Sequence, residues 1–266
     1  MFSLSTGQTI KALILDMDGV LWRENAPIGD LAATFANLNR SGLKVLLATN
    51  NATRTPAQYL QKLAGFGVHL QEDQVVNSSM GTAYLLKKRF PQGGPVYVIG
   101  EIGLTTALKE AGFYHSEEPG LAVIGSMDRD ITFWKLKAAT LLIRRGIPFY
   151  FTNPDRTFPT PEGLIPGAGA ILAALETATN ITPIIVGKPG TTLFDFALER
   201  LGTLPQETLV VGDRLETDIL GGQRAGCKTA LVLSGISTQE EANDWLPYPD
   251  LVINELSDLL QALDEH

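Results

Sequence analysis

The sequence predicts an α/β protein in which an open parallel sheet forms a core and a second α/β domain is inserted into that core. Three observations predict this fold class. Short, wholly apolar runs alternate with stretches of helical periodicity, as in βαβ units with buried parallel strands. The alternation occurs in two series, and the second series interrupts the first. Polar clusters directly follow several of the apolar runs, at positions where parallel strands would end.

The first series begins with the apolar run Ala12–Leu15, which ends abruptly at Asp16–Gly19 and is typical of a buried strand followed by a turn. A helical pattern over 29–39 leads to a second apolar run, Val45–Ala48, which stops at Thr49–Asn51. Strand, helix and strand make one βαβ unit. A further helix is predicted over Pro56–Ala64, and a short strand over Val75–Ser79 ends at a helix cap.

The second series lies between about Met80 and Pro183, and the first series resumes after it. Three strands are predicted in the second series: Val96–Gly100, Leu121–Gly125 and Pro148–Thr152. Four are predicted after it: Ile184–Val186, Leu209–Asp213, Ala230–Leu233 and Leu251–Ile253. We therefore predict a core domain formed by residues 1–79 and 184–266, with an inserted domain formed by residues 80–183.

Composition and charge limit the possible partners. The chain has 266 residues, of which 44% are hydrophobic and 19% charged, as expected for a compact globular protein. Its formal charge of −8 repels nucleic acid and anionic membranes, so we expect neither as a partner. The segment Met1–Thr9 does not resemble a signal peptide, and no apolar run approaches the roughly 18 residues that span a bilayer. We therefore expect a cytoplasmic protein.

Polar side chains at the carboxyl ends of parallel strands converge on one crevice, where ligands bind. Four clusters occupy such positions: Asp16/Asp18, Thr49/Asn50, Lys188 and Asp213/Asp218. Singly, each has an ordinary structural explanation, because an aspartate after a strand usually caps a turn and a lysine is usually exposed. Their combination is far more specific and predicts an active site.

Several aspartates in one crevice would repel one another strongly unless a cation lay among them. Oxygen ligands without His or Cys favour a hard metal ion, so we predict that the cofactor is Mg²⁺. With Lys188 as a second positive charge and Thr49 and Asn50 as neutral donors, such a site would hold a dianionic phosphoryl group.

Asp16 and Asp18 can take two different roles around one substrate. We predict that the Asp16 carboxylate attacks phosphorus and forms an aspartyl-phosphate. We predict that Asp18 protonates the leaving oxygen and later activates water.

Four segments resemble, in order, the four motifs of haloacid dehalogenase-superfamily phosphatases, which have a Rossmann-like core. They are Asp16–Leu21 (DMDGVL), Thr49–Asn51 (TNN), Gly187–Pro189 (GKP) and Gly212–Asp218 (GDRLETD). The inserted segment resembles the α/β type-2 cap of subfamily IIA, the nitrophenylphosphatase-like group, through Tyr97–Gly100, Thr152–Asp155 and Pro166–Gly169. That group includes phosphatases of phosphoglycolate, pyridoxal phosphate, glycerol phosphate and nucleotides.

This resemblance implies a role for each motif residue. Mg²⁺ would be bound by the carboxylates of Asp16 and Asp213 and by the backbone carbonyl of Asp18. Asp218 would support the metal site or Lys188 from nearby. The phosphoryl group would be bound by Thr49, Asn50, Asn51 and Lys188. The substrate would be a small phosphate monoester: a sugar or glycol phosphate, a nucleotide, pyridoxal phosphate or an aryl phosphate.

The cap must then select the leaving group, since the core holds only the phosphoryl group. We predict that a loop over Asp155–Pro159 reaches the leaving group through Asp155, Arg156 and Phe158. Phe133 and Trp134 are expected on the packing face of a helix. Caps of this type often pair with one another, so we also expect a homodimer through the cap.

Two alternatives remain open from the sequence. A phosphotransferase would pass the phosphoryl group to an acceptor hydroxyl instead of water. A receiver-like regulatory module would keep a stable phospho-aspartate to change a partner interaction. The second carboxylate, Asp18, and the large insertion favour a hydrolase over a receiver.

Overall fold

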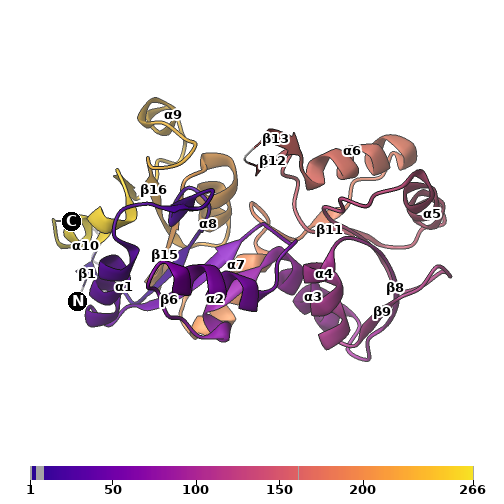
Figure 1. The fold of residues 1–266 in the computed structure, drawn as a ribbon, viewed down its shortest axis with the longest axis horizontal. Helices are drawn as coiled ribbons and strands as arrows, with labels where there is room; N and C mark the ends of the chain where they lie inside the picture. Colours follow the sequence, from indigo (N-terminus) through magenta and orange to yellow (C-terminus); the bar gives the residue numbers. More distant parts are fainter. Residues whose placement is uncertain (1, 4–8, 161, 266) are drawn as a thin grey trace. The chain divides into compact units, whose positions relative to one another are not determined.

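The structure is a computed structural model that describes residues 2–3, 9–160 and 162–265 (Figure 1). The chain forms two compact units, each made of more than one segment. The core unit comprises Met1–Thr49, Pro56–Val76 and Lys188–His266, and the second unit comprises Asn50–Thr55 and Asn77–Gly187.

The core unit is built on a six-stranded sheet with the strand order β17-β16-β15-β3-β6-β7. In chain order these strands are β3 (Ala12–Leu15), β6 (Lys44–Thr49), β7 (Val75–Asn77), β15 (Thr208–Gly212), β16 (Lys228–Val232) and β17 (Leu251–Ile253). The central strand β3 pairs in parallel with β15 and β6, and Leu15 is in register with Val211 and Leu47. The three strands therefore end at the same level, which brings the residues that follow them to one edge of the sheet. The prediction of an α/β fold with a parallel-sheet core is confirmed.

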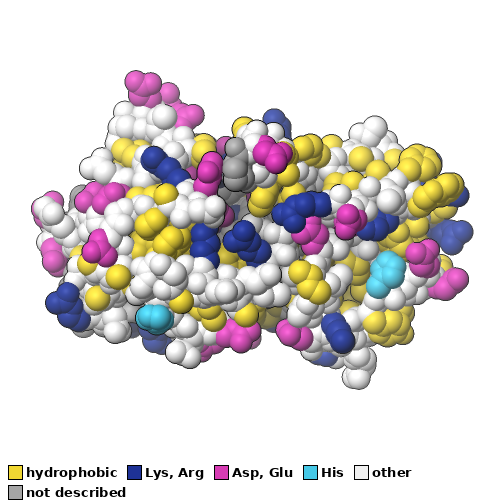
Figure 2. Space-filling model, viewed as in Figure 1, with side chains coloured by type: hydrophobic (Ala, Val, Ile, Leu, Met, Phe, Trp, Pro, Cys, Tyr) yellow, Lys and Arg dark blue, Asp and Glu magenta, His cyan; other side chains and the backbone are white. Residues whose placement is uncertain are grey.

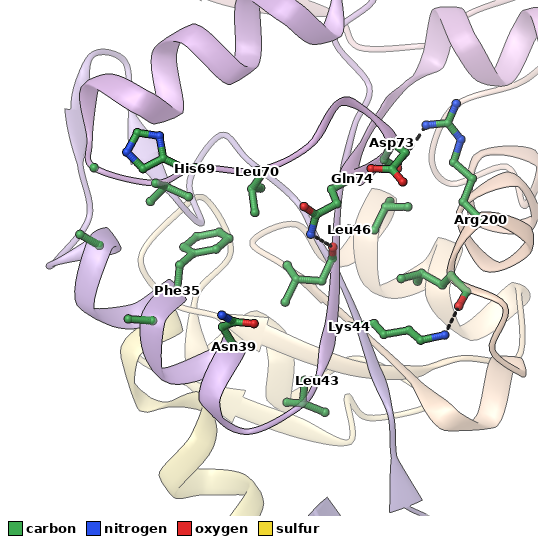
Figure 3. Close-up of a pocket in the computed structure, with 16 residues that line it drawn as sticks. Phe35, Asn39, Leu43, Lys44, Leu46, His69, Leu70, Asp73, Gln74 and Arg200 are labelled. Carbon is green, nitrogen blue, oxygen red and sulfur yellow. Dashed lines mark hydrogen bonds between the residues drawn. The ribbon is translucent and has the colours of Figure 1, made fainter.

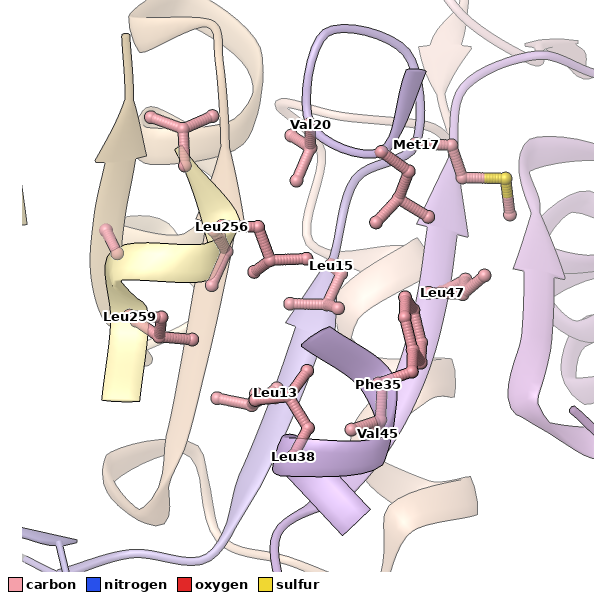
Figure 4. Packing of buried hydrophobic residues seen from close by; sticks show 14 of the residues in the cluster. Leu13, Leu15, Met17, Val20, Phe35, Leu38, Val45, Leu47, Leu256 and Leu259 are labelled. Atoms are coloured by element: carbon pink, nitrogen blue, oxygen red, sulfur yellow. The ribbon is translucent and has the colours of Figure 1, made fainter. Parts of the chain in front are cut away.

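Alternating side chains of the strands bury the two faces of this sheet, as the two-residue period of a strand requires. On one face, Leu13 and Leu15 pack with Phe35 of α1 and with Leu256 and Leu259 near the carboxyl end of the chain (Figure 4). On the other face, strand residues such as Ile14 and Leu46 pack against α7. The helices of the core unit are α1 (Leu31–Arg40), α2 (Pro56–Gly65), α7 (Thr192–Leu201), α8 (Leu220–Arg224), α9 (Gln239–Asn243) and α10 (Leu259–Glu265). Its short helical turns are η1 (Glu72–Gln74), η2 (Pro205–Glu207), η3 (Leu215–Ile219) and η4 (Leu256–Asp258).

Two small antiparallel pairs complete the core unit. One joins β1 (Phe2–Ser3) to β2 (Thr9–Ile10), and the other joins β4 (Trp22–Arg23) to β5 (Ala26–Pro27). The β4–β5 hairpin follows the Asp16–Gly19 turn directly, so it extends from the end of the central strand.

The second unit contains a five-stranded sheet with the strand order β14-β11-β10-β8-β9, and all its recorded pairings are parallel. Its strands are β8 (Gly94–Ile99), β9 (Phe113–His115), β10 (Val123–Gly125), β11 (Phe149–Phe151) and β14 (Ile184–Ile185). Its helices are α3 (Ser78–Arg89), α4 (Ile102–Glu110), α5 (Phe133–Arg144) and α6 (Ala168–Thr179). A hairpin of β12 (Thr157–Thr160) and β13 (Gly163–Pro166) precedes α6. Two apolar clusters form the core of this unit, one involving α5 and α6 and the other α3 and α4.

The structure corrects the predicted boundaries of the core. Ile184–Ile185 was predicted to be a core strand, but it pairs with β11 as an edge strand of the second sheet. The backbone of Gly187 continues this association by donating to Thr152 O at 2.7 Å. Residues 50–55 and 77–79 also belong to the second unit. The reason is that a short apolar run shows that a strand forms but contains no information about which sheet it joins.

Helix α5 corrects a second expectation. Phe133 and Trp134 are 73% and 69% exposed, whereas Ala139, Leu142 and Ile143 form the buried side of the helix. The two aromatic residues lie in the first helical turn, ahead of the part of α5 that packs, and their rings contact each other edge to face at 5.9 Å. The prediction that they pack inward is wrong.

The surface is mixed in charge. On the face shown in Figure 2, Asp and Glu side chains lie interspersed with Lys and Arg side chains. Within the described residues, no helix is both long and apolar enough to cross a membrane.

Candidate active site

The centre of the candidate active site is the ammonium group of Lys188, which is 3% exposed. Its Nζ donates to Asp218 Oδ1 at 2.6 Å, to the backbone oxygen of Ala48 at 3.0 Å and to Asp16 Oδ1. An ammonium has three donors, and each of these acceptors can take one of them. Asp16 follows β3, and Ala48 lies near the end of β6. The structure thus brings Asp16, Lys188 and Asp218 together, although they are far apart in the sequence.

Asp213, the third aspartate of this cluster, directly follows β15. One carboxylate oxygen from each of Asp16, Asp213 and Asp218 lies within 4.8 Å of the other two. Backbone amides fix the carboxylates of Asp213 and Asp218. Ile236 N donates to Asp213 Oδ2 at 2.9 Å, and Arg214 N donates to Asp218 Oδ2 at 3.1 Å.

Glycines give Asp213 and Asp218 the space that they need. A Cβ atom at Gly235 would lie 2.0 Å from Asp213 Oδ2, and one at Gly19 would lie 2.4 Å from the same oxygen. A Cβ atom at Gly212 would lie 2.1 Å from the Cβ of Asp218. Gly19 also has a φ of +87°, which a residue with a side chain rarely adopts. The close approach of backbone to carboxylate is therefore built into the fold.

The electrostatics of these three aspartates leave negative charge that protons or a bound cation would balance. Burial raises the pKa of Asp16 well above its ordinary value, and Asp218 and Asp213 add to this rise, whereas Lys188 opposes it. Burial and the neighbouring Asp218 raise the pKa of Asp213 to about 7. Burial alone would lower the pKa of Lys188, but Asp16 and Asp218 outweigh that effect, so the ammonium stays charged. One lysine cannot neutralise three closely spaced carboxylates.

The cluster of the three carboxylates of Asp16, Asp213 and Asp218 fits a hard divalent cation. Its ligand atoms are oxygens, and it contains neither His nor Cys, which is the ligand chemistry that Mg²⁺ prefers. Asp16 and Asp213 are the carboxylates that would hold the ion, and Asp218, which is bonded to Lys188 and to Arg214 N, would support them. A metal site is consistent with this geometry, and the choice of Mg²⁺ among divalent ions is a prediction from ligand chemistry.

Asp18, the second predicted catalytic carboxylate, lies in the turn after β3. Its Oδ1 accepts a hydrogen bond from the indole Nε1 of Trp22 at 2.7 Å. Asp18 is exposed, unlike the three aspartates around Lys188. Thr49, a predicted phosphate-binding residue, is the last residue of β6 and is 3% exposed.

The predicted phosphate-binding residues Asn50 and Asn51 belong to the second unit. The backbone oxygen of Asn50 accepts from Asn153 Nδ2 at 2.8 Å and from Ser78 Oγ at 2.5 Å, and Asn50 Nδ2 lies 3.4 Å from Asp155 Oδ1. Two residues from separate predicted sets, Asn50 and Asp155, therefore contact each other. Asn51 instead closes a local turn, because its Oδ1 accepts from both Thr53 N and Thr53 Oγ1.

The predicted cap loop, Asp155–Pro159, is partly a β-hairpin, since Thr157–Thr160 forms β12. Arg156 is exposed, and the ring of Phe158 lies 5.8 Å from the guanidinium carbon of Arg129. The backbone oxygen of Asp155 accepts from Gly169 N at 2.8 Å, which fixes the start of the hairpin. The roles predicted for Asp155, Arg156 and Phe158 in selecting the leaving group stay predictions.

Two parts of the core-unit site were not predicted from the sequence. One is Trp22, and the other is the segment Ser234–Ile236, which follows β16 and packs on Asp213. The signal for the second was available, since β16 is a strand of the same parallel sheet and ends at the same edge. The sequence Ser-Gly directly after an apolar run marks such a turn.

A separate pocket of about 690 Å³ lies in the core unit between α1, the start of β6 and the end of α7 (Figure 3). It is lined by Lys44–Leu46, in the amino-terminal half of β6, whereas Thr49 ends that strand. The pocket is therefore distinct from the candidate active site formed by Lys188 and the three aspartates.

Comparison with known proteins identifies the class of protein that this fold and site define. The sequence pattern of the haloacid dehalogenase-like hydrolases matches residues 13–114, and that of HAD-like hydrolases matches residues 185–259. The chain belongs to the haloacid dehalogenase-like hydrolase family. The predictions of this family and of an enzyme of its phosphatase class are confirmed.

Its relatives match over almost their whole length. The chain is 36% identical to 5'-nucleotidase YutF of Bacillus subtilis (strain 168) over 251 residues, which cover 94% of this chain and 98% of that protein. It is 35% identical to acid sugar phosphatase of Staphylococcus aureus (strain USA300), with 96% of this chain and 98% of that protein covered. The solved structure of p-nitrophenyl phosphatase from Archaeoglobus fulgidus is similar with a TM-score of 0.89 at 33% identity, covering 96% of this chain and 99% of that one.

Proposed function

We propose that this protein is a Mg²⁺-dependent phosphatase that hydrolyses small phosphate monoesters through an aspartyl-phosphate on Asp16. The observation that carries this proposal is the contact of Lys188 with both Asp16 and Asp218 beside Asp213. This arrangement holds a carboxylate nucleophile next to a fixed positive charge. The three carboxylates also carry more negative charge than Lys188 neutralises, and a divalent cation would balance the excess.

In the first step, a carboxylate oxygen of Asp16 forms a bond to phosphorus, and the bond from phosphorus to the ester oxygen breaks. Asp18 gives a proton to that departing oxygen, so an alcohol or phenol leaves and Asp18 becomes a carboxylate. Lys188 favours the ionised form of Asp16 before attack and offers positive charge to the phosphoryl oxygens during it.

In the second step, Asp18 takes a proton from a water molecule, whose oxygen attacks phosphorus. The bond between phosphorus and the Asp16 oxygen breaks, inorganic phosphate forms, and both carboxylates return to their starting states. Mg²⁺ held by Asp16, Asp213 and the Asp18 carbonyl would supply Lewis-acid neutralisation of phosphoryl charge. Thr49, Asn50 and Asn51 would donate hydrogen bonds to the phosphoryl oxygens.

The substrate class is a small phosphate monoester, including sugar or glycol phosphates, nucleotides, pyridoxal phosphate and aryl phosphates. The names of the relatives support this breadth, since they include a 5'-nucleotidase, an acid sugar phosphatase and a p-nitrophenyl phosphatase. Residues Asp155, Arg156 and Phe158 of the second unit would select among leaving groups. A panel of phosphorylated metabolites ranked by kcat/KM would identify the preferred substrate.

One assay tests the reaction type. Hydrolysis of an aryl phosphate is followed with Mg²⁺, with EDTA, and in the variants Asp16→Asn and Asp18→Asn. Steady phosphate release that EDTA and Asp16→Asn both abolish is the expected result. A single burst of labelled protein without turnover would favour a receiver-like module. Transfer of the phosphoryl group to an added alcohol in preference to water would favour a phosphotransferase.

We also propose that two copies associate through the second unit. The supporting observation is the group of exposed apolar side chains on α5: Phe133, Trp134 and Leu141, which are 73%, 69% and 47% exposed. Exposed apolar groups of this kind are typical of protein interfaces. Light scattering is expected to give a dimer for the wild type and a monomer for Phe133→Ser/Trp134→Ser. A monomeric wild type would contradict this.

The expectations of a cytoplasmic protein without a nucleic-acid partner stay predictions. The second of them rests on the formal charge of −8.

A further inference from the structure

The carboxylate of Asp18 has a specific partner in the core unit. The indole Nε1 of Trp22 donates to Asp18 Oδ1 at 2.7 Å, a short distance for an N–H···O bond. A carboxylate has two oxygens, and this bond fixes one of them. The other oxygen can then be directed to the substrate. The side chain of Trp22 has only this one polar group, so its hydrogen bond to Asp18 uses the whole donor capacity of the indole.

The backbone between the two residues returns Trp22 to Asp18. Gly19 N donates to Trp22 O at 2.8 Å, Leu21 N donates to Met17 O at 2.8 Å, and Asp18 and Trp22 form an isolated β-bridge. These bonds make residues 17–22 a tight turn. The geometry of the Asp18–Trp22 pair is therefore set by local backbone structure.

The turn is also fastened to the segment that holds Asp213. Ser234 Oγ donates to Gly19 O at 2.7 Å, and Arg23 Nε donates to Ser234 O at 2.7 Å. Ile236, two residues further along, donates its backbone N–H to Asp213. The Asp18–Trp22 pair and the carboxylates around Lys188 consequently share one rigid framework.

The indole ring itself is held on its far side. Trp22 is 1% exposed, Lys62 Nζ lies 4.0 Å from the centroid of its ring, and the ring of Phe66 lies 6.1 Å away. A cation over the face of an indole is attracted to the ring electrostatically, and its positive field acts on the N–H as well. This makes the N–H a stronger donor to an anion. The packing of Phe66 and Lys62 holds the ring in place, and the positive charge of Lys62 strengthens the hydrogen bond from the indole to Asp18.

From this geometry we infer that Trp22 is a positioning residue, which acts through Asp18 by orienting its carboxylate for proton transfer to the leaving oxygen. The inference rests on the proposed phosphatase reaction, in which Asp18 is the proton donor. In the first step, which kcat/KM reports, a residue that positions the acid matters only when the leaving group needs a proton. A stabilised phenolate such as p-nitrophenolate leaves without one, whereas an alkoxide does not.

The test is therefore a leaving-group series. Phosphate esters from p-nitrophenyl through phenyl to alkyl phosphate are compared by kcat/KM in the wild type and in Trp22→Phe. Phenylalanine keeps an aromatic ring in the buried site and removes the N–H donor. We expect a loss within about threefold for p-nitrophenyl phosphate, rising to about tenfold to a hundredfold for alkyl phosphates, a part of what positioned proton transfer contributes.

The matched control is Phe66→Leu, which disturbs the packing around the indole but leaves its N–H in place. We expect this variant to change kcat/KM by a similar, small factor across the series. If Trp22→Phe does not fold, as judged by its thermal transition, benzothienylalanine at position 22 serves instead. This analogue keeps the shape of tryptophan and replaces only the N–H with sulfur.

A double variant separates action through Asp18 from any other action. In an Asp18→Ala background, Trp22→Phe is expected to have no further effect on phosphoenzyme formation, measured by rapid quench across the aryl series. An equal loss for all leaving groups, or the same loss in the Asp18→Ala background, would overturn the positioning role. Absence of Mg²⁺-dependent turnover in the wild type would overturn the proposed function, and with it this inference. The wild-type assay thus distinguishes the two failures.

Discussion

Lys188 donates to Asp218 Oδ1 at 2.6 Å, and both side chains are 3% exposed. A buried ion pair of this kind is weak evidence for stability, but removing one partner leaves an uncompensated buried charge. Since Lys188 also pairs with Asp16, it is the group on which the charge balance of the site depends.

Replacement of this lysine tests that balance. In EDTA, Lys188→Met is expected to lower the free energy of unfolding by roughly 3 to 5 kcal/mol, the range for breaking a buried ion pair. It is also expected to abolish measurable turnover. Urea denaturation with and without Mg²⁺ measures the first effect, and added Mg²⁺ should recover part of the loss because it replaces the missing charge.

Lys44→Met is the matched control for this variant. Lys44 also donates to a backbone oxygen, that of Leu201 at 2.7 Å, but it is exposed and lies at the opposite end of β6 from the site. We expect its loss to change stability and turnover little. Equal effects of the two substitutions would argue against a special role for Lys188.

Stability of the metal-free protein should depend on pH through Asp213. Its pKa is raised to about 7 in the folded protein, whereas an unperturbed aspartate titrates near about 3.9. Between these values the folded protein holds a proton that the unfolded chain has lost. The stabilisation is therefore complete below about pH 4 and is lost as the pH rises through about 7. Urea denaturation in EDTA at pH 5 and pH 8 measures the change, and Asp213→Asn should remove this component.

Asp213→Asn should separate stability from metal binding. At pH 8 in EDTA, the variant is expected to be more stable than the wild type by roughly 1 to 3 kcal/mol, because each pKa unit corresponds to about 1.4 kcal/mol. Its Mg²⁺ affinity should fall sharply, since an amide oxygen replaces a charged ligand. Calorimetric titration with Mg²⁺ gives the affinity. A variant that is less stable in EDTA yet binds Mg²⁺ normally would contradict both halves of this prediction.

Gly235→Ala should weaken metal binding indirectly, because the new side chain would displace the ligand Asp213 and would not itself bind the metal. The added methyl group would lie 2.0 Å from Asp213 Oδ2, so the carboxylate must move. We expect Mg²⁺ affinity to fall by about tenfold or more, in keeping with the effect of residues that orient metal ligands. Gly65→Ala is the control, because a Cβ atom there meets nothing within 4 Å. Unchanged affinity in Gly235→Ala would show that Asp213 tolerates displacement.

Much of the core-unit site could be predicted because its chemistry follows strand ends. Asp16, Asp213 and Asp218 are recognisable by their charge and by the apolar runs before them, whereas the run before Lys188 belongs to the sheet of the second unit. A parallel sheet then brings such residues to one edge. This relationship needs no knowledge of side-chain direction.

What could not be predicted depends on tertiary structure. The sequence has no signal for which sheet Ile184–Ile185 joins. The exposure of Phe133 and Trp134 depends on where α5 begins to pack, which the sequence does not show either. Trp22 looks like an ordinary apolar residue after the Asp16–Leu21 motif. Only the tight turn that returns its indole to Asp18 reveals its polar contact.

The central claim is that the Asp16 carboxylate attacks phosphorus. The most direct measurement is rapid acid quench of the protein mixed with ³²P-labelled p-nitrophenyl phosphate and Mg²⁺, followed by peptide mapping. We predict covalent label on the peptide that contains Asp16, no label in Asp16→Asn, and accumulation of label in Asp18→Ala, where the water-activating group is missing. Steady turnover in Asp16→Asn, or wild-type turnover without covalent label in any quenched sample, would contradict the account.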